Sequence, residues 1–392
     1  MDFRFTPEEE QFQQEVRQFL KEELPPNWED QFDAETQIGA DQQFEFARQF
    51  SKKLAQRRWL AMPWPTEYGG LAASVIQQLI YNEEMSYQGA PEAFSMGVAW
   101  VGPSIMLYGS DEQKQRLLPP IANHDEIWCT LYSEPGAGSD LASLQTRAVR
   151  DGDEWVINGQ KIWTSGGHRA TWGWLAARTD ADAPKHKGIS MFVVPMRSAG
   201  LTIRPLVNMA GRHGFNEIFF QDVRIPADNL VGQENQGWYQ LAVALDFERS
   251  SIAGVARTRR SWEEMVDFAR ENRRFVQARP EIRHRLAQMG VEIEVGQYLS
   301  YRVASLQQAG KAPNYEASIA KLYCSELAQR LARTGMELLG LYGQLQASSK
   351  YAPLRGRIEH YYLDSTARTI GGGTSEIMRN VIATRGLGLP RG

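Results

Sequence analysis

The sequence is poor in cysteine, since its 392 residues contain only Cys129 and Cys324. The two lie far apart, and neither belongs to a CxxC or Cys/His spacing. The sequence therefore predicts neither a disulfide framework nor a zinc site, and no metal is expected. So few cysteines are also typical of a protein from a reducing compartment.

Long apolar runs and a large excess of one charge are missing too. The N-terminal residues show no basic segment followed by an apolar stretch, and no uninterrupted apolar run approaches the length of a membrane span. The 43 basic and 47 acidic side chains leave a formal net charge of −4, which does not favour a nucleic-acid or anionic-membrane partner. We expect a cytoplasmic protein with no membrane span and no nucleic-acid partner.

Two nucleotide-binding signatures are absent as well. The chain has no GxGxxG after a strand and no GxxxxGK[ST], which disfavours nicotinamide-binding and P-loop folds. What it has is the composition of a globular protein, with 42% hydrophobic residues, 11 Trp and 14 Tyr. Its length is sufficient for two or three structural units.

Secondary-structure signals change twice along the chain. Early residues are helical in pattern, beginning over 6–24, where Thr6 can cap the helix and Pro7 suits its first position. A β-prone region follows, and Asn158-Gly159 between two β-prone runs predicts a hairpin turn. Helical patterns then return, with one long helix expected over 238–271. The predicted α+β domains are a helical domain at 1–125, a β domain at 126–234 and a second helical domain at 235–392.

Two stretches of the β region could carry chemistry. In "CTLYSEPGAGSD" small residues allow a ligand to approach the backbone, and Ser133 and Ser139 offer hydroxyls, although an ordinary Gly/Pro turn would explain this stretch alone. In "INGQKIWTSGG" the indole of Trp163 stands beside Thr164 and Ser165, a combination that suits a flat heteroaromatic ligand. A buried structural tryptophan would explain that stretch equally well.

Taken together, the motifs are more specific than any one of them. "YSEPGAGSD", "NGQKIWTSGG", "FNEIFFQDVRIP" and a terminal "GGGTSEIMRNVIATRGLGLP" follow one another in a chain ordered α, β, α. This set resembles the acyl-CoA dehydrogenase family over almost the whole chain. The resemblance implies an N-terminal helical domain, a middle β-barrel-like domain and a C-terminal four-helix bundle, with FAD between domains and against a neighbouring subunit.

The resemblance also implies roles for individual residues. Acyl-CoA would be contacted by Ser139, Asp246 and Arg249. The FAD contacts carried over from the family are Thr130, Leu131, Tyr132, Ser133, Gly138, Ser139, Trp163, Thr164, Ser165, Arg273, Glu337, Gly340, Thr374 and Glu376, together with the backbone of Ser375.

The family reaction needs a base that removes the α-proton while a hydride leaves the β-carbon for the flavin. Many members carry a glutamate just before Gly-Thr in the terminal motif, where this chain has Gly372. Other members carry it on the first helix of the C-terminal domain, in a context similar to "LDFERSSIAG", which makes Glu248 the expected base. The backbone N–H of Gly372 would still bond the thioester carbonyl.

Several features leave alternatives open. Pro280 stands where the family usually has a Gln, and Glu337 and Leu341 stand where Gln and Gly are common, which puts cross-subunit FAD contacts in question. The missing terminal glutamate leaves a non-catalytic subunit of a heteromer as an alternative to a dehydrogenase of lipid β-oxidation, and an oxidase-like enzyme is a further alternative. The resemblance implies an electron-transfer flavoprotein as acceptor and a homotetramer or mixed tetramer. Some members with this terminus act on bulky, branched or steroid acyl groups, but the sequence leaves the acyl group open.

Overall fold

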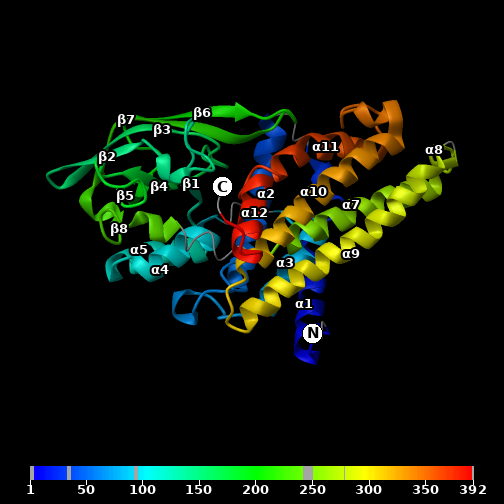
Figure 1. The fold of residues 1–392 in the computed structure, drawn as a ribbon, viewed down its shortest axis with the longest axis horizontal. Helices are drawn as coiled ribbons and strands as arrows, with labels where there is room; N and C mark the ends of the chain where they lie inside the picture. The colour runs from blue at the N-terminus through cyan, green and yellow to red at the C-terminus, as the bar shows by residue number, and fades with distance from the viewer. Residues whose placement is uncertain (1–3, 33–36, 92–95, 242–249, 278, 391–392) are drawn as a thin grey trace. The chain divides into compact units, whose positions relative to one another are not determined.

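The computed structural model describes residues 4–32, 37–91, 96–241, 250–277 and 279–390 (Figure 1). Backbone contacts divide the chain into two compact units, each assembled from segments distant in sequence. We name them the helical unit and the sheet unit. The helical unit comprises Met1–Pro26, Ser74–Ala90 and Arg249–Gly392, and the sheet unit comprises Asn27–Ala73 and Pro91–Glu248.

The first helix of the helical unit starts as its sequence predicts. Thr6 is the N-cap, and its side chain and that of Glu9 bond each other's backbone N–H groups, while Pro7 takes the first helical position. This reciprocal cap satisfies two amides that an uncapped helix leaves without partners. The buried face of the helix carries Phe19 and Leu20.

Three long helices, α7 (Ile252–Glu271), α9 (Pro280–Gln308) and α10 (Asn314–Leu339), lie side by side in the helical unit (Figure 1). Their shared core includes Met265, Leu286, Leu331 and Leu338. The other helices of this unit are α1 (Pro7–Glu23), α3 (Val75–Tyr87), α8 (Arg274–Gln277), α11 (Arg357–Arg368) and α12 (Ser375–Val381).

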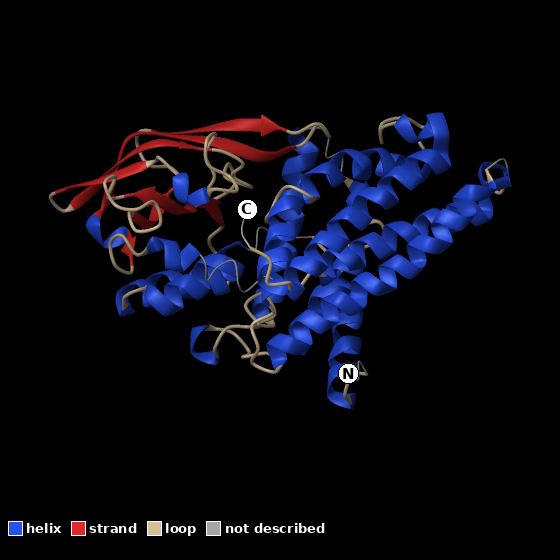
Figure 2. Ribbon diagram, viewed as in Figure 1, coloured by secondary structure: helices blue, strands red, loops and turns tan. Residues whose placement is uncertain are grey.

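The β-prone region of the sequence forms the strands of the sheet unit (Figure 2). They form one sheet in the order β6-β7-β3-β2-β4-β5-β8, with β1 pairing in parallel with β4 off this path. The elements are α2 (Gln37–Gln56), α4 (Gly102–Tyr108), α5 (Asp111–Ala122), β1 (Trp128–Leu131), β2 (Arg147–Asp151), β3 (Glu154–Lys161), β4 (Trp172–Arg178), β5 (Ile189–Pro195), β6 (Leu201–Val207), β7 (His213–Pro226) and β8 (Leu230–Val231).

Strand β4 is buried on both faces of the sheet. Trp174 and Ala176 belong to a cluster that also contains helical residues such as Leu117, whereas Leu175 and Ala177 belong to the cluster on the other side. Alternating side chains point to opposite faces of a strand, so a continuous apolar run is needed where both faces are covered. This explains why "WGWLAAR" carries no polar residue before its final arginine.

The hairpin prediction at Asn158-Gly159 is wrong. Both residues lie inside β3, and the chain turns instead at Gly152, between β2 and β3. Gly159 is required by close packing, since a Cβ there would lie 2.7 Å from the Cα of Thr146. Asn158 uses its side chain to bond the side chain and backbone N–H of Asp222 on β7. The Asn-Gly pair therefore marks an irregular strand, not a turn.

The prediction of one helix over 238–271 is also wrong. A helical stretch is described at 237–241, but Ser250 and Ser251 are not helical and α7 begins at Ile252. Helix periodicity therefore overestimated the length of this element, because apolar spacing does not report a break in the backbone. Elsewhere the β-prone region does form strands, and the helical patterns that return after it do form helices.

Candidate functional site

The glycine-rich segment after β1 is anchored by a buried ion pair. Lys161 Nζ donates to Glu134 Oε1 at 2.8 Å and to Tyr132 O at 2.9 Å. The Glu134 carboxylate also accepts the backbone N–H groups of Gln145 and Thr146 at 2.6 and 2.8 Å. Burial would raise the pKa of Glu134, but the adjacent ammonium and the hydrogen bonds from Thr146 and Gln145 together outweigh it and hold that pKa below its usual value. Burial lowers the pKa of Lys161 to about 8.

This arrangement brings together the two stretches singled out in the sequence. The backbone N–H of Ile162 donates to Ser133 O at 2.9 Å, so the "YSEPGAGSD" and "IWTSGG" segments lie next to each other. Beyond this contact Gly136 and Gly138 face open space, because a Cβ on either would meet nothing within 4 Å. Small residues and free space on one side are what a ligand that approaches the backbone requires.

Trp163 and Thr164 have the properties expected of ligand-contacting residues. Trp163 has a φ of 61°, and its side chain is 56% exposed, with Phe215 in edge contact at 5.9 Å. Thr164 is 1% exposed, yet its hydroxyl finds no hydrogen-bond partner among the residues that the structure describes. A buried hydroxyl without a partner is costly, so a ligand atom at this position would compensate it. A planar heteroaromatic cofactor fits both residues.

The predicted contact residues between 130 and 139 differ in how far their side chains are exposed to a ligand. Thr130 and Ser133 are half-buried and Ser139 is exposed, but the side chain of Leu131 is fully buried in the sheet core. Any cofactor contact of Leu131 must therefore use its backbone. The ring of Tyr132 stacks on Trp100 at 6.0 Å.

A group of polar side chains behind Thr164 was missed by sequence reasoning. Asn216 on β7 is fully buried and bonds both the N–H and the C=O of Thr164, at 3.1 and 3.0 Å. Its side chain also contacts His168 and His213, whose rings stack at 4.0 Å. The available signal was the Asn in "FNEIFF", next to apolar residues of a β-prone segment. The partnership with Thr164 depends on residues 52 positions apart.

The terminal glycine run lies in the helical unit. Gly372 has a φ of +66°, and a Cβ on it would meet nothing within 4 Å. Thr374 caps α12, with its hydroxyl accepting the N–H of Ile377 at 3.2 Å, and Ser375 Oγ is buried without a partner in the described part of the chain. Its own backbone N–H and the Thr374 hydroxyl lower the pKa of the exposed Glu376.

Two of the expected FAD contacts, Glu337 and Gly340, lie close to Arg279. Arg279 donates to the carbonyls of Glu337 and Leu338, and the Glu337 carboxylate pairs with Arg285. A Cβ on Gly340 would lie 3.7 Å from Arg279 Nη2. Arg273 is exposed in the turn immediately before α8. Asp246, Glu248 and Arg249 lie outside the described residues.

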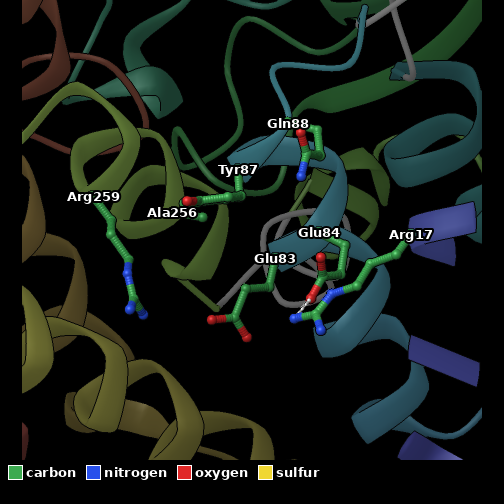
Figure 3. Close-up of a pocket in the computed structure, with 7 residues that line it drawn as sticks. All are labelled: Arg17, Glu83, Glu84, Tyr87, Gln88, Ala256 and Arg259. Atoms are coloured by element: carbon green, nitrogen blue, oxygen red, sulfur yellow. Dashed lines mark hydrogen bonds and ion pairs between the residues drawn. The ribbon is translucent and has the colours of Figure 1, made fainter. Parts of the chain in front are cut away.

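A polar cavity of about 340 Å³ opens between α1, α3 and α7 of the helical unit (Figure 3). Arg17 pairs with the buried Glu84 at 2.7 Å, and the Glu83 carboxylate accepts from Gln297 and Tyr301 at 2.8 and 2.7 Å. In this view Glu83 points between Arg259 and the Arg17–Glu84 pair. The lining residues are Arg17, Glu83, Glu84, Tyr87, Gln88, Ala256 and Arg259.

Two kinds of feature are absent from the described ranges. No group of three or more His, Cys, Asp or Glu side chains is arranged to hold a metal ion. Nor does any helix in these ranges combine the length and the apolar character of a membrane span.

Family models cover most of the chain. They are the acyl-CoA dehydrogenase N-terminal domain at residues 6–125, middle domain at 129–223 and C-terminal domain at 235–387. Among curated relatives, acyl-CoA dehydrogenase FadE26 of Mycobacterium tuberculosis is 37% identical, over 100% of this chain and 99% of its own. The human mitochondrial short-chain specific acyl-CoA dehydrogenase is 33% identical, over 94% and 88% respectively.

Solved structures agree with this match. The Tcur3481-Tcur3483 steroid ACAD superposes with a TM-score of 0.90 at 36% identity, and the ChsE4-ChsE5 complex from Mycobacterium tuberculosis with 0.89 at 37%. Each alignment covers 100% of both chains. The predicted three-part fold is thereby confirmed.

Proposed function

Because this chain belongs to the acyl-CoA dehydrogenase family, and so is an FAD-dependent oxidoreductase acting on acyl-CoA thioesters, we propose that Glu248 is its catalytic base. The observation that carries the proposal is Gly372, which has no side chain where many members have the glutamate. Glu248 precedes α7 by four residues, in a stretch with the apolar neighbours Phe247, Ile252 and Ala253. Apolar surroundings raise the pKa of a carboxyl toward the value that a base at neutral pH needs.

The product of the proposed reaction is the trans-2-enoyl-CoA. Glu248 removes the α-proton, and the bound FAD supplies the acceptor for the hydride that leaves the β-carbon. As the proton leaves, negative charge develops on the thioester oxygen, so a preplaced donor there lowers the barrier. We assign that donor to the backbone N–H of Gly372, which any residue except proline would retain at this position.

Trp163, Thr164 and Ser165 would hold the flavin ring, together with the segment Thr130–Ser139. The unpartnered Thr164 hydroxyl, the exposed Trp163 indole and the open space beside Gly138 support this assignment. Thr374, Ser375 and Glu376 would meet the diphosphate region through their backbone amides. Ser139, Asp246 and Arg249 would contact acyl-CoA.

The second candidate function is a non-catalytic subunit of a heteromer. The ion pair of Glu337 with Arg285 favours it, because that carboxylate is already engaged where FAD contacts across a subunit interface are expected. The name of the ChsE4-ChsE5 complex records an assembly of two different chains in a similar protein. A homotetramer or mixed tetramer, an electron-transfer flavoprotein as acceptor and a cytoplasmic location belong to the same proposal.

The test is anaerobic bleaching of the flavin band by straight, branched and steroid-type acyl-CoAs. We expect the wild type to bleach, and Glu248→Gln to bind FAD and acyl-CoA without bleaching. Glu271→Gln makes the same change at the far end of α7 and should behave as wild type. Equal bleaching by wild type and Glu248→Gln would show that the base lies elsewhere. A wild-type chain that binds no flavin would favour the non-catalytic subunit.

A further inference from the structure

The side chain of Asn216 uses all of its principal hydrogen-bonding groups. Its Nδ2 donates to Thr164 O at 3.0 Å and lies 3.2 Å from His168 Nδ1, while its Oδ1 lies 2.8 Å from His213 Nε2. An amide offers two donors and one acceptor oxygen, so this pattern requires His168 to accept at Nδ1 and His213 to donate at Nε2. Both imidazoles are thereby set in one tautomer, and the amide has a single orientation.

The backbone of Asn216 contributes a further bond to the same residue. Thr164 N donates to Asn216 O at 3.1 Å, so both backbone polar groups of Thr164 are held by one residue of β7. Packing is also close, because a Cβ on Gly167 would lie 3.4 Å from Asn216 Nδ2 and 2.9 Å from Thr164 Cγ2. Thr164 therefore has little freedom to rotate or shift.

The segment before Thr164 needs such restraint. Trp163 has a φ of 61°, a left-handed conformation that costs a residue with a side chain about 1 kcal/mol. A strained conformation of this kind persists only where surrounding contacts hold it. Phe215, which contacts the Trp163 ring, is the neighbour of Asn216 on β7. The same strand therefore supports the indole and the threonine.

We propose that Asn216 is the positioning residue of the Trp163–Thr164 segment, holding the indole and the Thr164 hydroxyl in the places where they meet the flavin. This inference rests on the proposed function. It assigns a role to the Asn of the "FNEIFF" motif and to the two histidines, which act on the flavin only through Thr164. The charges of Arg169 and Asp41, which pair with each other, also act on the His168 ring.

The test compares Asn216→Ala with Asn229→Ala. Asn229 is a matched control, because it is buried in the same unit and its Nδ2 also holds a backbone carbonyl, that of Val193 at 2.9 Å. Two quantities are measured besides activity: the Kd for FAD of the apoprotein, and deuterium uptake of the peptide 162–169. We expect Asn216→Ala to weaken FAD binding about tenfold and to speed uptake in this peptide, because three side-chain bonds are lost. Asn229→Ala should change neither.

Two further variants keep the test decisive if Asn216→Ala does not fold. Asn216→Asp is isosteric but removes the donor to Thr164 O, and His213→Phe keeps a ring against His168 but removes the donor to Asn216. Both variants should weaken FAD binding, as Asn216→Ala does. FAD affinity and peptide uptake within twofold of the Asn229→Ala values would overturn the inference. If wild type binds FAD but no acyl-CoA bleaches it, the proposed reaction fails, while the affinity comparison still decides the role of Asn216.

Discussion

Lys161 Nζ lies 2.8 Å from Glu134 Oε1, and both side chains are buried in the sheet unit. The pair also binds Tyr132 O and the N–H groups of Gln145 and Thr146, so it joins three segments of chain. We predict that Lys161→Met lowers the free energy of unfolding by about 3–5 kcal/mol, because it leaves an unpaired buried carboxylate. Urea unfolding of the apoprotein measures this loss.

The double variant Glu134→Gln/Lys161→Met provides the control for that prediction. Removing both charges leaves no buried ion without a partner, so the double variant should lose less than the sum of the two single variants. Strictly additive losses would show that the two side chains act independently.

His124 should make the protein sensitive to acid. It is 4% exposed, and burial, with the positive charges of Lys52 and Arg48 nearby, lowers its pKa to about 4. Between its ordinary pKa and this value the unfolded state takes up a proton that the folded state refuses. The free energy of unfolding should therefore fall by up to about 3 kcal/mol as pH drops from about 6.5 to about 4.

The variant His124→Asn isolates this effect. The backbone of residue 124 has a φ of 54°, which Asn tolerates better than most residues, and Asn does not titrate. Unfolding in urea at several pH values between 7 and 4 should show a shallower loss for the variant. Parallel curves for the two proteins would mean that His124 does not contribute.

Glu83 should have the opposite pH dependence. Burial raises its pKa, so above the ordinary pKa of a glutamate the folded state retains a proton that the unfolded state has lost. Stability contributed by this group is present in acid and declines as pH rises. We predict that Glu83→Gln, whose amide can still bond Gln297 and Tyr301, is at least as stable as wild type at pH 7.

A carboxylate in an ordinary ion pair serves as the comparison for Glu83. Glu292 pairs with Arg330 at 2.6 Å, so Glu292→Gln removes an attraction and should not stabilise the protein. Thermal unfolding of both variants at pH 5 and pH 7 checks the contrast. A Glu83→Gln protein clearly less stable than wild type at pH 7 would contradict the prediction.

Gly372→Ala tests whether the reaction depends only on the backbone N–H at this position. A left-handed φ of +66° makes the alanine cost about 1 kcal/mol of stability, while its Cβ meets no described atom within 4 Å. Because the proposed donor is the backbone N–H, the rate of flavin bleaching should fall less than about tenfold. Glu248→Gln should reduce that rate by at least about 100-fold. A Gly372→Ala protein that binds both ligands but no longer bleaches would refute the assigned role.

Much of the helical unit could be predicted from local sequence. The capping pattern at Thr6 and Glu9 places the start of α1, and the apolar spacing places α9 and α10, because capping and helical periodicity involve residues only three or four positions apart. The same short range explains why the prediction of one helix over 238–271 was wrong. Ser250 and Ser251 interrupt the helix, but their effect depends on surroundings that apolar spacing does not describe.

The amino-acid sequence by itself determined the α, β, α order, the family motifs and the absence of a glutamate at Gly372, since these are properties of single residues and short segments. Only the tertiary structure decided the partners of Asn216 and of Glu134, and the position of Asn158 inside a strand. Each of those depends on how β3 and β7 align with segments tens of residues away, and strand register is set by packing across the whole sheet.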